Sequence, residues 1–182
     1  TPDRILYEIK DGFSQTEVLA ASFSKFEREY QDYLIVQEVL KRSGGIQVLF
    51  DTVGNVKDPV GFAQALGTLG KGIQEELRRN LSNRFALERY LRGVEKALTK
   101  SLSESLATAI EKHPSPLALL MDTYEELEGL DDWVCRTLIP ALPKGVFVVV
   151  LGRNALPKVN FEWGEFGKAL HTMELPELTE AD

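Results

Sequence analysis

The chain has 182 residues, of which 43% are apolar and 27% are charged, and this is the ordinary composition of a globular protein. The length suits one well-buried core, so we expect a single domain over residues 1–182. No apolar run approaches the roughly 20 residues that a membrane span needs, so we expect a soluble, cytoplasmic protein with no membrane partner.

Charge and cysteine content narrow the functional classes. The formal net charge is −7, and the basic residues are scattered among acidic ones instead of forming one stripe. Nucleic acid is therefore not expected as the principal partner. Cys135 is the only cysteine, which excludes an internal disulfide, and with His113 and His171 as the only histidines the chain has no zinc-ligand set.

The first residues, Thr1-Pro2-Asp3-Arg4, show neither an initiator methionine nor the basic and then apolar pattern of a signal peptide. We therefore expect a piece of a longer protein. Its expected partners are neighbouring domains or other protein chains, and oligomerisation is left open.

Three short apolar runs, each bounded by glycine or proline, predict buried strands at residues 46–50, 117–121 and 146–151. They are apolar at consecutive positions instead of alternating, which is typical of parallel strands covered by helices on both faces. With helices between the strands, this predicts an α/β fold, a three-layer sandwich with a mostly parallel sheet like that of P-loop NTPases.

Apolar residues at helical spacing predict the remaining elements. We expect residues 44–178 to form the core, and residues 1–43 to be a helical or phosphate-loop region. Residues 5–9 fit either a strand or an early helical turn, and residues 171–175 fit a fourth short strand. The predicted helices are 20–40, 58–73, 77–98, 103–113, 125–138 and 161–170.

The strand at 117–121 ends in Asp122, which places this acid at the carboxyl edge of the sheet, where open α/β folds bind ligands. In P-loop ATPases an acid at this position holds Mg²⁺, and a second acid just beyond it polarises the attacking water. Asp122 is therefore our candidate metal ligand and Glu125 our candidate catalytic residue. The alternative is that Asp122 only caps the following helix.

Residues 117–178 resemble bacterial STAND-type ATPases, the signal-transduction class of P-loop ATPases. The family carries an apolar strand ending in Asp-Thr-Tyr-Glu, a helix with Leu-Asp-Asp-Trp, a second strand ending in Gly-Arg, and a tryptophan-containing helix. The matching residues here are Asp122-Thr123-Tyr124-Glu125, Leu130-Asp131-Asp132-Trp133, Gly152-Arg153 and Trp163.

The resemblance implies ATP or ADP with Mg²⁺ as the ligand, and it implies that Arg153 is a sensor arginine facing the γ-phosphate. A guanidinium suits that role because it offers paired, charge-assisted donors. The alternative is a surface arginine paired with Glu162 or Glu165.

The phosphate loop departs from the family, because no segment satisfies G-x-x-x-x-G-K-[ST]. The nearest literal match, residues 65–72, follows a helix and is interpreted as a hinge. By its position, the better candidate is Gly12, Ser14, Gln15 and Thr16, which lacks the second glycine and the lysine, so we expect weak or absent hydrolysis. The alternative is an ordinary loop or helix cap.

Together these features predict a regulatory STAND-type ATPase domain in which the bound nucleotide acts as a conformational switch. One alternative is a pseudo-ATPase that works as an interaction or scaffold module, and another is an unrelated α/β domain. A loop at residues 12–16 would favour nucleotide binding, and a straight helix there would favour the scaffold.

Overall fold

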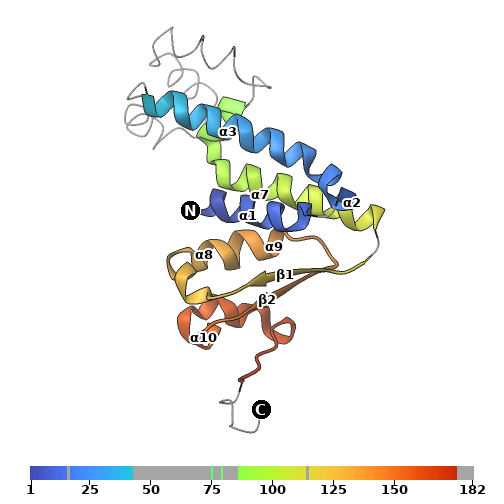
Figure 1. Cartoon of the computed structure of the whole chain (residues 1–182). Helices are drawn as coiled ribbons and strands as arrows, with labels where there is room; N and C mark the ends of the chain where they lie inside the picture. The colour runs from blue at the N-terminus through green and yellow to red at the C-terminus, as the bar shows by residue number, and fades with distance from the viewer. Residues whose placement is uncertain (16, 43–74, 76–78, 80–85, 114, 176–182) are drawn as a thin grey trace, which may run out of the picture. The chain divides into compact units, whose positions relative to one another are not determined.

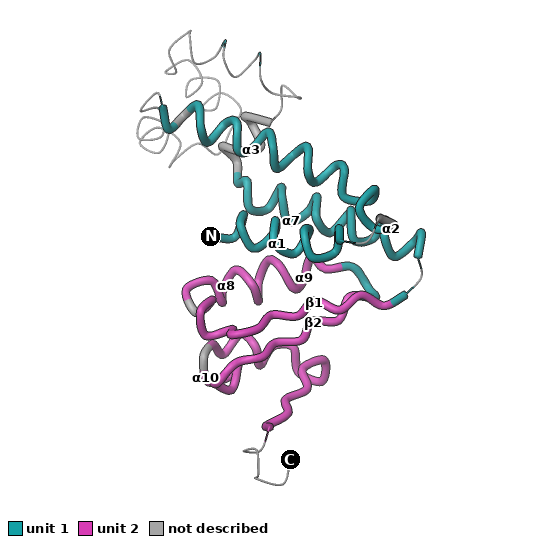
Figure 2. The backbone as a smooth tube through the Cα atoms, in the orientation of Figure 1, with its two compact units in different colours: residues 1–115, 143–145 teal, residues 116–142, 146–182 magenta. Residues whose placement is uncertain are grey.

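The computed structural model describes residues 1–15, 17–42, 75, 79, 86–113 and 115–175. It divides into two compact units, shown in Figure 2: unit 1 is residues 1–115 with 143–145, and unit 2 is residues 116–142 with 146–182. The single domain expected over residues 1–182 stays a prediction.

Unit 1 consists of helices in the part that the structure describes. The helix predicted over residues 20–40 is confirmed, and residues 5–9 form part of a helix instead of a strand. The long helix α7 joins residues 86–98 of the helix predicted at 77–98 to the helix predicted at 103–113, ends at Lys112, and has a break at Gly93, where φ is +130°. The helix predicted at 58–73 lies outside the described residues. The elements are α1 (Pro2–Ser14), α2 (Glu17–Ala20), the 3₁₀ helix η1 (Ala21–Phe23), α3 (Ser24–Arg42) and α7 (Ala86–Lys112).

The core of unit 1 lies where α3 and α1 pack against α7, and Figure 1 shows α3 and α7 running side by side. Leu98, Leu102 and Leu106 recur every four residues, so they share one face of α7, and each is at most 2% exposed. Phe26 and Val36 of α3 are fully buried. Burial of a side chain of this size contributes about 1.5–3 kcal/mol.

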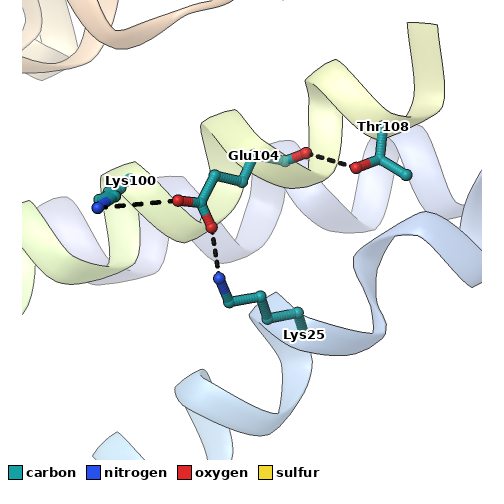
Figure 3. Close-up of polar contacts among 4 residues, drawn as sticks. All are labelled: Lys25, Lys100, Glu104 and Thr108. Carbon is teal, nitrogen blue, oxygen red and sulfur yellow. Dashed lines mark hydrogen bonds and ion pairs between the residues drawn. The ribbon is translucent and has the colours of Figure 1, made fainter. Parts of the chain in front are cut away.

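A charged cluster also joins α3 to α7, as Figure 3 shows. Lys25 of α3 donates a hydrogen bond to Glu104 of α7, and Lys100 Nζ lies 3.9 Å from the other carboxylate oxygen. The hydrogen bond from Lys25 is the main cause that lowers the pKa of Glu104 below its ordinary value.

Unit 2 contains the two strands predicted from its apolar runs, β1 (Leu117–Met121) and β2 (Val146–Val150). They pair in parallel, as predicted, from Leu117 opposite Val146 to Met121 opposite Val150, and lie side by side in Figure 1. The fourth strand predicted at 171–175 is wrong, since these residues have no regular structure. The strand predicted at 46–50 lies outside the described residues.

The burial of the strands differs from the expected cover on both faces. Leu119 and Met121 are buried, whereas Leu120, Phe147 and Val149 are exposed by 60%, 63% and 43%. Successive side chains of a strand point to opposite faces, so one face of this pair is covered and the other is open. The three-layer sandwich stays a prediction.

Helical turns of three kinds follow β1 and of two kinds follow β2, and they confirm the helices predicted at 125–138 and 161–170. No helix in the described ranges is both long and apolar enough to cross a bilayer. After β1 come the 3₁₀ helix η2 (Tyr124–Leu130), α8 (Asp131–Trp133), the π-helical turn η3 (Val134–Leu138) and α9 (Ile139–Ala141); after β2 come α10 (Leu156–Val159) and the 3₁₀ helix η4 (Phe161–Ala169).

Replacing Lys25→Gln should raise the pKa of Glu104 toward its ordinary value, because the main donor to the carboxylate is lost. The folded-state pKa is lowered, so the stability that this contact contributes is present above the ordinary pKa and lost as pH falls through the lowered value. Carboxyl carbon NMR titration measures the change. Lys100→Gln is the matched control and should raise the pKa less; equal shifts in the two variants would contradict the assignment.

Candidate functional site

The candidate site lies at the carboxyl ends of β1 and β2, where backbone hydrogen bonds extend beyond the paired residues. Leu151 N donates to Met121 O at 2.8 Å, and Tyr124 N donates to Leu151 O at 2.9 Å. These bonds hold the segment after β1 against the segment after β2. The sequence predicted this edge as the ligand site, and its three predicted residues in unit 2 all lie along it.

Asp122 and Thr123 form the turn that leaves β1. Thr123 has left-handed backbone angles, φ 53° and ψ 46°, and its amide donates to Asp122 Oδ1 at 2.8 Å. Asp122 is exposed and makes this bond to the residue that precedes η2, so it does not cap the helix by bonding an amide inside it. Its carboxylate keeps acceptor capacity toward solvent.

Glu125 and Arg153 form an ion pair across the two segments. Arg153 Nε lies 3.3 Å from Glu125 Oε1, and the backbone amide of Arg153 donates to Glu125 Oε2 at 3.4 Å. The Glu125 side chain is 24% exposed and that of Arg153 is 88% exposed. The Glu125 carboxylate is therefore the more buried member of the pair, and the Arg153 guanidinium is the exposed one.

The predicted alternative partners of Arg153 were Glu162 and Glu165. In the structure Arg136 instead donates a hydrogen bond to Glu162, and Arg153 forms an ion pair with Glu125. The sequence named Glu125 and Arg153 for one site but did not predict that they contact each other.

Gly152 permits this close approach. A Cβ on Gly152 would lie 3.3 Å from Glu125 Oε2 and 3.4 Å from Tyr124 Cβ, which is tighter than most side-chain contacts. A larger residue would require the Glu125 carboxylate to shift by a few tenths of an ångström from its contact with the segment after β2.

Beneath the site, a buried carboxylate anchors the same turn. Asp131, 5% exposed, accepts hydrogen bonds on Oδ1 from Tyr124 OH and from Trp163 Nε1, the latter at 3.1 Å. The Tyr124 and Trp163 rings meet edge to face with centroids 5.6 Å apart. The resemblance to STAND-type ATPases includes Tyr124, Asp131 and Trp163 as motif positions but implies no role for them.

The same environment raises the pKa of two neighbouring groups. Burial, reinforced by the bond to Asp131, raises the pKa of Tyr124 well above its ordinary value. Burial also raises the pKa of Cys135 to about 11, with Asp131 and Glu162 adding to the effect. Cys135 is therefore a neutral thiol at physiological pH.

The proposed phosphate-loop residues belong to unit 1. Gly12 and Ser14 lie in the last turn of α1, and Gln15 follows with right-handed helical angles, φ −64° and ψ −18°. Thr16 and residues 65–72 lie outside the described residues. The loop expected from the sequence is thus a helix as far as Gln15, because the buried residues Leu6, Ile9 and Lys10 give α1 one packed face that stabilises it.

The residues at this edge could bind Mg²⁺ only together with waters and phosphates, as in nucleotide sites. Among the described residues, no three His, Cys, Asp or Glu side chains are grouped to hold a metal. Mg²⁺ in such sites is held by one or two carboxylates together with waters and phosphates. Asp122, as one exposed carboxylate, fits that arrangement and does not fit an all-protein cage.

Comparison with protein-family models, with curated proteins and with solved structures found no match.

Replacing Tyr124→Phe should destabilise unit 2 by about 1.5–3 kcal/mol, because the buried Asp131 carboxylate loses a charge-assisted donor. Both tryptophans of the chain, Trp133 and Trp163, lie in unit 2, so urea unfolding followed by tryptophan fluorescence reports this unit.

The control for this variant is Tyr7→Phe, which deletes the same hydroxyl in unit 1. It should leave the fluorescence transition within about 0.5 kcal/mol of wild type. A Tyr124→Phe midpoint equal to that of this control would refute the anchoring role.

Proposed function

We propose that the chain is a regulatory ATPase domain of the STAND type, in which ATP or ADP bound with Mg²⁺ acts as a conformational switch and hydrolysis is weak or lost. The observation that carries the proposal is that Asp122, Glu125 and Arg153 lie together at the carboxyl ends of two adjacent parallel strands. We expect it to act in the cytoplasm, with neighbouring domains or other protein chains as partners.

Charge chemistry supports a phosphate ligand at this edge. The Arg153 guanidinium is 88% exposed, so it can turn its planar donors toward a phosphate without loss of packing. Asp122 is exposed on the preceding turn and can hold Mg²⁺ directly or through water. A Mg²⁺–phosphate group would then satisfy both side chains, one through the metal and the other through the anion.

Hydrolysis has less support than binding. Glu125 polarises a water through an open acceptor site on its carboxylate, and here the Arg153 backbone amide already takes one such site on Oε2 while the guanidinium Nε lies 3.3 Å from Oε1. The helical end of α1 also differs from the strand-to-helix turn whose amides cradle a phosphate. We therefore propose a switch that depends on occupancy more than on turnover.

A second candidate is an interaction or scaffold module without nucleotide. Two observations favour it: Gly12 and Ser14 are helical, and Leu120 and Phe147 expose an apolar sheet face. An exposed apolar patch is a common feature of interaction surfaces.

Thermal unfolding with Mg-ATP and Mg-ADP separates the two candidates. A ligand that binds only the folded state raises the midpoint, by about 3 °C or more at ten times its dissociation constant for a domain of this size. Asp122→Ala should abolish the rise and Arg153→Gln should reduce it, whereas Lys158→Gln, which removes a similar exposed charge from α10, should preserve it. No rise at millimolar nucleotide would reject the switch and leave the interaction module.

A further inference from the structure

The ion pair between Glu125 and Arg153 has two contacts of different kinds. The guanidinium Nε meets Oε1, and the backbone amide of the same arginine meets Oε2. The first contact can be lost by a rotation of the Arg153 side chain. The second depends on the backbone after β2, which Gly152 allows to pass close to Glu125 and which hydrogen bonds from Tyr124 and Leu151 hold in place.

A phosphate ligand and Glu125 compete for the same guanidinium. The guanidinium has five N–H donors, so a contact at Nε leaves other donors for a phosphate, but the Glu125 carboxylate offsets the positive charge that attracts the phosphate. A nucleoside triphosphate with several negative oxygens is a stronger partner for this charge than one carboxylate. Binding would therefore draw the guanidinium away from Oε1 and leave the backbone amide donor on Oε2.

We propose that the Glu125–Arg153 ion pair is an autoinhibitory contact, which without nucleotide occupies both the phosphate-binding arginine and the candidate catalytic carboxylate. Nucleotide phosphate draws Arg153 away and frees Oε1, while the Arg153 backbone amide keeps the carboxylate oriented through Oε2. This inference rests on the proposed function and adds a regulatory mechanism to it.

The exposure of the pair matches such a role. Arg153 is 88% exposed, and an ion pair that faces solvent in this way shifts an equilibrium by no more than about fivefold. That is large enough to reduce affinity measurably, since apparent affinity falls with the fraction of molecules that are ready to bind. It is also small enough for a phosphate to overcome.

The test is the dissociation constant of a non-hydrolysable Mg-ATP analogue, measured by calorimetry on the full chain at fixed salt. Glu125→Gln should tighten binding by about two- to fivefold, because the competing charge is gone while the amide-accepting side-chain oxygen remains. Tryptophan fluorescence verifies that each variant is folded.

Glu126→Gln is the matched control, since it removes the same charge from the next residue of η2, outside this ion pair. It should change affinity by less than about 1.5-fold, because its exposed charge is screened by salt and takes no part in the ion pair. A second control places Glu125→Gln in an Arg153→Gln background, where the gain should disappear.

Failure of the two proposals would look different. No binding by the wild-type chain would overturn the nucleotide switch and this inference together. Binding by wild type with no gain in Glu125→Gln, an equal gain in Glu126→Gln, or a gain that persists without Arg153 would overturn the autoinhibitory contact alone.

Discussion

The arrangement of unit 2 depends on one buried carboxylate. Asp131 accepts hydrogen bonds from Tyr124, seven residues before it, and from Trp163, 32 residues after it. A charge removed from water is costly unless donors compensate it, so Asp131 can be buried only while both partners are in place. This requirement ties the start of η2, the start of α8 and the middle of η4 into one packed arrangement.

The exposed edge takes its geometry from this anchor. Tyr124 is fixed by its side chain below and by its amide bond to Leu151, so its neighbours in sequence must point along the strand ends. Glu125 consequently reaches the segment at Gly152, and Asp122 is left toward solvent on a left-handed turn. The buried residues supply rigidity, and the exposed ones supply the charges that a phosphate and a cation need.

The sequence predicted the features that depend on local patterns of residues, namely the strands and the edge at which they end. Continuous apolar runs predicted both strands, and parallel pairing placed Asp122 and Arg153 at one edge. It did not predict non-local outcomes: which acid Arg153 contacts, or which face of the strands is covered. Residues 12–15 were interpreted from family position, whereas the packed face of α1 makes 12–14 helical and Gln15 keeps helical angles. The role of Asp131 could not be read locally, because it is followed by a second acid, Asp132, and only the fold buries the first and exposes the second.

The most direct test of the central claim, that Arg153 belongs to a nucleotide-phosphate site, is the side-chain Nε signal of Arg153 in ¹⁵N NMR during a titration with Mg-ATP. We expect a saturable shift of this signal as the guanidinium leaves Glu125 for the phosphate, and no shift with Mg²⁺ alone. An Arg153 signal that stays unchanged at millimolar Mg-ATP would contradict it.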